Sequence, residues 1–156
     1  MESCSSDVDT ALLSAEYQRL MSWSWHTVMI TSSILSKWSS TRMISEDISN
    51  DEQKLIRDVG FTLMHILLTC RHRGTIETAG GPLTEYLTGT NQLKEEKGLL
   101  NSEQVLNYCF LTLTKCKYSV SRRSAGLWHL VKGSFYAMIS SNSRKTHYLY
   151  NNKALN

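Results

Sequence analysis

The sequence has few residues that interrupt helices and none of the marks of export. It contains one proline in 156 residues and little alternation of Val with Ile, so helices are favoured over a sheet. No basic and apolar leader opens the chain, which argues against a secretory signal. Four cysteines, Cys4, Cys70, Cys109 and Cys116, form no Cys-X-X-Cys pair. We therefore predict reduced thiols and a cytoplasmic location, with the nucleus as the other compartment of this redox class.

No hydrophobic run is long enough to cross a bilayer. The most apolar stretch, residues 61–70, is about half the length that a membrane-spanning helix requires. Hydrophobic residues make up 41% of the chain and charged residues 20%, a balance typical of a folded globular protein. We therefore predict one folded domain without a membrane span.

Acidic residues are missing from the last third of the chain. Residues 104–156 contain eight Lys/Arg and no Asp/Glu, a net charge of +8, whereas residues 1–103 contain nine Lys/Arg and 14 Asp/Glu, a net charge of −5. A basic terminal third is the electrostatic footprint expected for a nucleic acid or an acidic protein partner. A solvated basic face is the alternative interpretation.

Apolar residues recur at helical spacing in five segments, and no strand pattern is present. The expected helices are 15–38, 50–71, 75–88, 102–116 and 122–140. Consecutive helix pairs favour an all-α α-solenoid of HEAT- or armadillo-like helical repeats. The expected organisation is a disordered N-terminus at 1–13, a helical-repeat domain at 14–141 and a polar C-terminal tail at 142–156.

The first expected helix carries an apolar stripe and three tryptophans. The stripe consists of Tyr17, Met21, Trp25, Val28, Ser32 and Leu35. Trp23 and Trp38 fall elsewhere on the helix surface, which indicates a helix packed on two sides within a larger array. This pattern favours packing over a ligand site.

The second and third expected helices are bounded by local signals. Ser49 and Glu52 have the form of a capping box that opens the second helix. The segment 71–74 (Arg-His-Arg-Gly) is expected to close it, because basic residues complement a helix end and glycine suits the C′ position. The segment 80–82 (Gly-Gly-Pro) is expected to kink or split the third helix.

The start of the fifth expected helix contains an electrostatic conflict. Ser121 suits an N-cap, which places Arg122 and Arg123 in the first turn. The helix dipole is positive there, so each exposed cation costs about 0.3–1 kcal/mol. We therefore expect a negative group opposite the arginines, either a phosphate or a carboxylate such as Glu77 or Glu85.

No enzyme signature is present in the sequence. There is no Gly-rich nucleotide loop, no HExxH motif and no Cys/His set with zinc spacing. A Cys/His nucleophile pair stays open as an alternative, because such residues meet in space rather than in sequence. We predict no catalytic residue, no cofactor and no metal site.

Three segments occur in an order that resembles a known family. They are residues 22–28 (SWSWHTV), 70–77 (CRHRGTIE) and 121–126 (SRRSAG). Their types and order resemble the conserved central domain of the thyroid-adenoma-associated protein family and its fungal tRNA-methylation counterpart. The resemblance covers about residues 16–140.

The resemblance implies a very long helical-repeat protein without catalytic residues of its own. The fungal member is the partner of an FtsJ-like methyltransferase and directs 2′-O-methylation to nucleotide 32 of the tRNA anticodon loop. Animal relatives are also tied to a calcium pump of the endoplasmic reticulum. The residues implied in binding tRNA or the partner are Arg122, Arg123, Ser124, Ala125 and Gly126, and also Arg71, His72, Arg73 and Gly74.

These observations together lead to one functional hypothesis and two alternatives. We expect a non-catalytic subunit whose partners are an FtsJ-like 2′-O-methyltransferase and the tRNA anticodon stem-loop. Arg122 and Arg123 would donate to tRNA phosphate or to carboxylates of adjacent repeats, Gly126 would allow a close helix approach, and Ala125 would keep the contact tight. The alternatives are a protein-binding scaffold without a tRNA role, for example at the calcium pump, and a truncated non-functional fragment.

Overall fold

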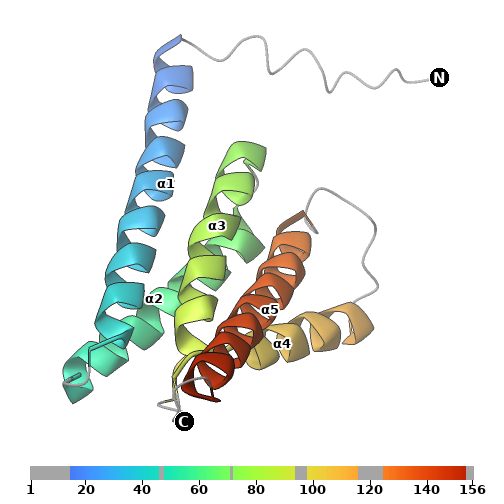
Figure 1. Ribbon diagram of the computed structural model, residues 1–156. Helices are drawn as coiled ribbons and strands as arrows, with labels where there is room; N and C mark the ends of the chain where they lie inside the picture. Colours follow the sequence, from blue (N-terminus) through green and yellow to red (C-terminus); the bar gives the residue numbers. More distant parts are fainter. Residues whose placement is uncertain (1–14, 46–47, 71, 94–97, 116–124, 154–156) are drawn as a thin grey trace.

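The chain folds as two layers of α-helices. The computed structural model describes residues 15–45, 48–70, 72–93, 98–115 and 125–153. The helices are α1 (Ala15–Met43), α2 (Asn50–Thr69), α3 (Arg73–Thr90), α4 (Ser102–Lys115) and α5 (Ala125–Lys153). α1, α3 and α5 lie side by side, and α2 and α4 lie behind them, so the chain alternates between the layers (Figure 1). The predicted all-α helical-repeat fold is confirmed.

α1 packs against α3 through small polar residues. Its buried residues are Ser32, Ser36, Ser39 and Met43. The hydroxyl of Ser36 donates to the carbonyl oxygen of Pro82 at 2.6 Å, which ties the two helices together across the layer. Because serine is small, the helices can approach closely here. The predicted apolar stripe was only partly correct, since Tyr17 and Met21 remain 45% and 47% exposed.

The capping box at the start of α2 is confirmed. The backbone N–H of Glu52 donates to the Ser49 hydroxyl, and the Glu52 carboxylate accepts from the Ser49 backbone N–H at 3.0 Å. Arg42, in the last turn of α1, donates to the same carboxylate at 2.6 Å. This ion pair joins the end of α1 to the start of α2.

The Gly-Gly-Pro segment was expected to kink or split α3, and the helix continues through Pro82 without a split. Proline in a helix interior loses one hydrogen bond and crowds the preceding turn. The two glycines before it have no Cβ to add to that crowding. The helix is also held on both sides, by α1 through Ser36 and by α5 against Gly80, and this packing outweighs the local penalty.

The core lies between the layers, around Tyr86 of α3. Its side chain is fully buried, as are those of Ile56, Leu63 and Leu130. The Tyr86 ring lies directly over Gly60 of α2, where any Cβ would overlap it. Burial raises the pKa of Tyr86 far above its ordinary value, and the backbone of Leu100 lowers it by less. Tyr86 is therefore a neutral core phenol.

α5 is longer than the sequence suggested. It continues to Lys153, whereas a helix ending near residue 140 and a polar tail were expected. Its largest hydrophobic side chains do not form the buried face, since Trp128 and Phe135 are 64% and 53% exposed. The face that is buried is built instead from smaller residues and two leucines: Gly126, Leu127, Leu130, Gly133, Ser134, Ala137 and Ser141.

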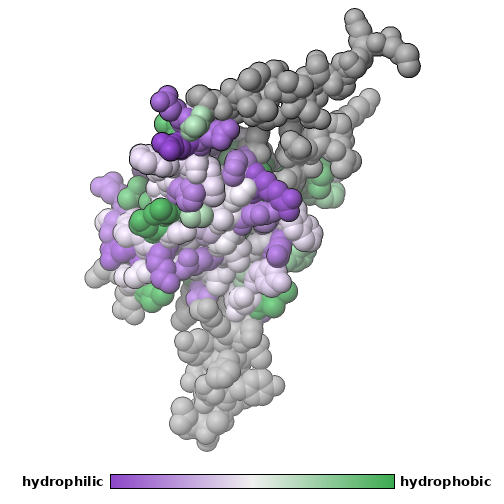
Figure 2. Space-filling model, turned by 90° about the horizontal axis from the view of Figure 1, so that it is seen from above, coloured by the Kyte–Doolittle hydropathy of each residue, from purple (hydrophilic) through white to green (hydrophobic). Residues whose placement is uncertain are grey.

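The described surface seen from above, at the end where α3 and α5 begin, is mostly hydrophilic or neutral. Hydrophobic residues on this face are separated from one another (Figure 2). The large exposed hydrophobic side chains belong mainly to α1, α4 and α5, among them Trp23, Phe110, Trp128 and Ile139. Apolar surface is therefore concentrated on particular helices. None of the described helices is long and apolar enough to cross a membrane.

Candidate functional site

The start of α5 is anchored against the end of α2. Gly126 is buried in the first turn of α5, and a Cβ at this position would overlap the carbonyl oxygen of Leu67. Leu67 belongs to the last turn of α2, so the two backbones are in direct contact. Only glycine permits such a contact. From the sequence, Gly126 was expected to serve a close helix approach, and the structure shows α2 as the helix approached.

This contact also brings opposite helix ends together. The last turn of a helix carries carbonyl groups without helical partners and a partial negative charge, and the first turn carries the reverse. The last turn of α2 contains no basic residue, and the first turn of α5 contains no acidic one. The carbonyl of Leu67 therefore supplies negative potential where α5 begins. Arg122, Arg123 and Ser124 lie outside the described residues, so their contacts stay a prediction.

The Arg71–Gly74 segment opens α3 instead of closing α2, which corrects the sequence interpretation. α2 ends at Thr69, and His72 is the N-cap of α3, with its Nδ1 accepting from the backbone N–H of Thr75 at 3.3 Å. Arg73 and Gly74 thus lie in the first turn of α3. The connection between the helices is too short for a separate glycine cap. Arg71 itself lies outside the described residues.

Trp25 of α1 holds the histidine cap in place. Its ring stacks on His72 with centroids 4.9 Å apart and planes at 23°, and on His26 with centroids 3.9 Å apart. His26 is oriented by a 2.7 Å contact between its Nδ1 and the carbonyl oxygen of Ser22. A Cβ at Gly74 would lie 3.1 Å from the His72 ring, so glycine leaves room for the stack. Two of the three segments that suggested the family are thus in contact.

The acidic residues expected to answer the arginines, Glu77 and Glu85, already have basic partners on α3 and α1. Arg73 donates to Glu77 at 2.6 Å, one turn along the helix, although the Arg73 side chain is 91% exposed. The hydrogen bond from Arg73 lowers the pKa of Glu77, and the same bond raises the pKa of Arg73. Glu85, the other acid expected to answer the arginines, pairs with Lys37 at 3.7 Å. Both acids therefore have partners among the described residues.

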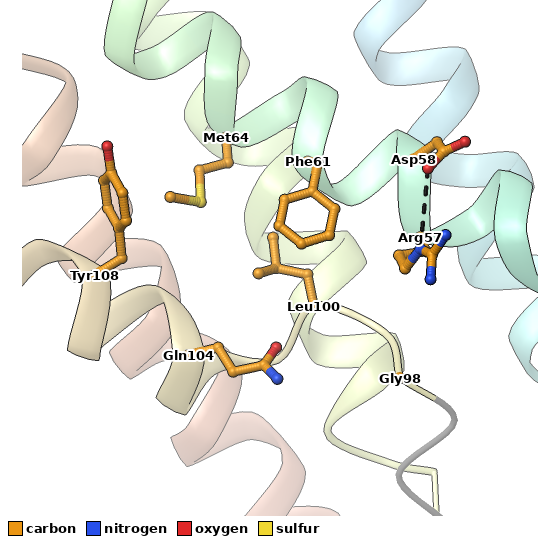
Figure 3. Close-up of a pocket in the computed structure, with 8 residues that line it drawn as sticks. All are labelled: Arg57, Asp58, Phe61, Met64, Gly98, Leu100, Gln104 and Tyr108. Atoms are coloured by element: carbon orange, nitrogen blue, oxygen red, sulfur yellow. Dashed lines mark ion pairs between the residues drawn. The ribbon is translucent and has the colours of Figure 1, made fainter.

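A groove lies between α2 and α4, on the side of the molecule behind α3. It has a volume of about 600 Å³, and Phe61, Met64, Leu100 and Tyr108 surround it with an Arg57–Asp58 pair at one edge (Figure 3). A neighbouring hollow of about 490 Å³ shares Phe61, Met64 and Tyr108 and extends to His65 and Leu68. Sequence reasoning missed this groove, because no motif marks it and its walls come from helices far apart in the chain.

The described residues were compared with two kinds of reactive site, a metal cluster and an activated thiol. They contain no group of three or more His, Cys, Asp or Glu residues that could hold a metal ion. Cys109 is buried, and burial raises the pKa of its thiol, which disfavours the nucleophilic thiolate. The starts of α3 and α5 lie at the same end of the helix array (Figure 1).

A family model described as THADA/TRM732, DUF2428 matches residues 2–153. Because this match spans nearly the whole chain, the chain belongs to that family, as the order of the three segments suggested. No match was found among curated proteins or among solved structures.

Proposed function

We propose that this member of the THADA/TRM732 family is a non-catalytic helical-repeat subunit of the machinery for tRNA 2′-O-ribose methylation, in the cytoplasm. Its catalytic partner is an FtsJ-like methyltransferase, and its RNA target is the anticodon stem-loop, with nucleotide 32 as the methylated position. Family membership supports an association with tRNA modification. The acid-free third at residues 104–156 supports a polyanionic partner.

The observation that carries the proposal is the anchoring of Gly126 on Leu67. This contact places the start of α5 at a fixed point of the fold. Arg122, Arg123 and Ser124 immediately precede this point in the sequence. In the proposal the two guanidinium groups bind phosphates of the anticodon loop, which suits a planar bidentate donor. In the proposal Ala125 and Gly126 allow the start of α5 to stay close to α2.

His72, Gly74 and the exposed Arg73 extend the same surface from the start of α3. In the proposal Arg71 and Arg73 add positive charge to the rim, with Arg73 exchanging Glu77 for a phosphate when RNA binds. Solvent screens the exposed ion pair between Arg73 and Glu77, so this exchange costs little.

A binding measurement on this chain tests the RNA contact. Affinity for an anticodon stem-loop RNA is measured over a range of salt concentrations for the wild type and for Arg122→Ala/Arg123→Ala. Removing one phosphate interaction reduces the slope of log K against log salt by about 0.7–0.9, so the double variant is expected to lose about 1.4–1.8. The matched control removes two exposed basic residues elsewhere, Arg19→Ala/Lys54→Ala, and keeps the wild-type slope. If the two variants show the same slope of log K against log salt, Arg122 and Arg123 do not bind the RNA phosphates.

The methylation role is tested in a full-length relative that carries the same two substitutions. Methylation of nucleotide 32, read by mass spectrometry of purified tRNA, is expected to disappear while the protein is expressed at its normal level. Retained methylation would exclude the arginines from this function.

A protein-binding scaffold without a tRNA role is the second candidate, and the exposed apolar faces of α1 and α5 favour it. Such a scaffold could serve a calcium pump of the endoplasmic reticulum. The salt titration separates the two, because an apolar protein interface lacks the steep salt dependence of phosphate binding. A chain that binds neither RNA nor protein would support the truncated, non-functional alternative.

A further inference from the structure

Three aromatic rings form one stacked group where α1 meets the start of α3. Trp25 of α1 stacks on His72, the N-cap of α3, with centroids 4.9 Å apart and planes at 23°. Trp25 also stacks on its neighbour His26, with centroids 3.9 Å apart and planes at 30°. We call these three residues the ring stack. Trp25 is half-buried and both histidines are exposed, so the ring stack presents imidazole rings to the solvent.

The cap of α3 accounts for only two of the three rings. His72 accepts from the backbone N–H of Thr75, and Trp25 lies against the His72 ring. His26 is held within α1 instead, by its stack on Trp25 and by a 2.7 Å hydrogen bond between its Nδ1 and the carbonyl oxygen of Ser22. Because this exposed ring is already held in one orientation, a ligand that stacks on it loses little affinity to ordering the side chain.

The hydrogen bonds also assign a tautomer to each neutral histidine. A carbonyl oxygen only accepts, so Nδ1 of His26 carries the proton that it donates to Ser22. A backbone N–H only donates, so Nδ1 of His72 is unprotonated and its ring proton is on Nε2. The Nε2 atoms are therefore an acceptor on His26 and a donor on His72. Flat rings with polar edges of both kinds suit a heteroaromatic ligand better than an aliphatic one.

The ring stack lies on a face of the array that neighbouring repeats do not cover. His26 and Arg42 are 16 residues apart on α1 (42 − 26), about 160° around the helix. Arg42 pairs with Glu52 of α2, so its side of α1 faces the second layer and His26 lies on the side away from that layer. Lys37, about 20° from His26 around the helix, has a side chain that is 79% exposed. Repeats stack on the edges of such a layer, so a neighbouring repeat does not account for the exposure of this face.

The ring stack is continuous with the surface to which the proposed function assigns RNA. His72 belongs to both, and Arg73, which follows it, has a side chain that is 91% exposed. The start of α5 lies at the same end of the array (Figure 1). Proteins that bind single-stranded nucleic acid combine cations for the phosphates with aromatic rings on which the bases stack. This end of the molecule brings both kinds of group together.

From these observations we infer that the ring stack is a stacking platform for one unpaired base of the tRNA anticodon loop, an inference that rests on the proposed function. Unpaired loop bases stack on aromatic side chains, and histidine is one of the residues that serve. The base lies on the exposed ring of His26, and Trp25 supports this ring from its other side. Phosphate contacts carry no information about the base, so the platform adds a contact that is independent of charge.

The protein side is tested by measuring affinity for an anticodon stem-loop RNA at about pH 8, where an ordinary histidine is neutral. His26→Ala removes the outer ring and leaves the cap of α3 in place. It is expected to weaken binding about 5- to 100-fold, the range for losing one stacked base. The slope of log K against log salt stays at the wild-type value, because no charge is removed. His26→Phe keeps an aromatic ring and is expected to retain most of the affinity.

The matched control is His65→Ala, which removes an exposed histidine from α2 in the other layer. This variant is expected to bind the stem-loop as tightly as the wild type. Circular dichroism verifies that every variant keeps its helical content.

The RNA side is tested with stem-loops in which one loop base at a time is replaced by an abasic sugar. One of these RNAs is expected to bind the wild type more weakly by the same factor as His26→Ala. His26→Ala is expected to bind that abasic RNA no more weakly than the intact RNA, because the base and the ring form one interaction. Losses that add at every loop position would show that His26 stacks on none of these bases.

The outcomes separate the ring stack from the proposed function. If His26→Ala binds like the wild type while Arg122→Ala/Arg123→Ala loses salt dependence, the stacking platform is wrong and the RNA contact of the arginines stands. A wild type that does not bind the stem-loop overturns both. A His26→Phe variant as weak as His26→Ala, or a His65→Ala variant with an equal loss, overturns the platform alone.

Discussion

Gly126 and Gly133 are both buried on α5, but a side chain at each position would meet a different kind of atom. At Gly126 the obstacle is the backbone carbonyl of Leu67, which the last turn of α2 holds in place. At Gly133 it is the hydroxyl of Thr84, 2.7 Å away at the end of a rotatable side chain. The two glycines therefore differ in how much of the structure must move to admit a methyl group.

We predict that Gly126→Ala destabilises the fold by about 2–3 kcal/mol, because α5 must move away from α2. Gly133→Ala is expected to stay within about 1 kcal/mol of the wild type, since Thr84 can rotate and alanine has the higher helix propensity. The free energies of unfolding come from urea titrations followed by circular dichroism. Equal losses for the two variants would contradict the rigid contact at Leu67.

The start of α3 depends on two interactions of one side chain, the cap to Thr75 and the stack on Trp25. We predict that His72→Ala costs about 1–2 kcal/mol, because it removes both. His72→Asn supplies a side-chain oxygen as N-cap acceptor but no aromatic ring, so it is expected to recover roughly half of the loss. Urea unfolding measures both. An asparagine variant no more stable than the alanine variant would show that the cap contributes nothing.

Helix boundaries were predictable where both residues of a capping interaction lie close together in the sequence. The Ser49–Glu52 capping box identified the start of α2, because both partners lie within one turn. The end of α2 was not predictable, since Arg71–Gly74 carries the residue types of a helix end although α3 begins there. A histidine N-cap is an uncommon signal, and its partner Trp25 lies on another helix. The Gly-Gly-Pro segment does not split α3 for a related reason. Its packing on α1 and α5 outweighs the local tendency of these residues to interrupt a helix.

The buried faces of the edge helices could not be derived from periodicity alone. α1 and α5 each carry apolar residues on two sides, and spacing does not say which side faces the core. In α5 the buried side is Leu127, Leu130 and small residues, whereas Trp128 and Phe135 point outward. The candidate site shows the same limit, since Gly126 was predicted to allow a close approach but its partner Leu67 lies far away in sequence. Such pairings are set by the tertiary fold.

At the scale of the whole molecule, the array has apolar surface on both of its edge helices. The tryptophan pattern of α1 indicated a helix packed on two sides, and the structure shows which side is left open. The proposed RNA contacts lie at a different place, the end where α3 and α5 begin.

Stability of the whole fold is expected to fall in acid partly through Glu52, which joins α1 to α2. The hydrogen bond from the Ser49 backbone is the largest cause that lowers the Glu52 pKa below its ordinary 4.5; the Ser49 hydroxyl and Arg42 also lower it, and burial opposes them. A carboxyl group with a lowered folded-state pKa stabilises the fold above its unfolded pKa. That contribution is lost as pH falls through the folded value.

We therefore predict that Glu52→Gln is less stable than the wild type at pH 7 and that this gap stays constant down to about pH 4.5. Below that pH the gap closes, because the wild-type carboxylate becomes protonated. Glutamine still completes a capping box, so the gap reports the charge rather than the loss of the cap. Glu103→Gln, an exposed acid in the first turn of α4, is the control for changing one charge. Urea unfolding at pH 7, 5, 4 and 3 gives the curves, and a gap that widens in acid would exclude the ionised Glu52 carboxylate, with its bonds to Ser49 and Arg42, as its source.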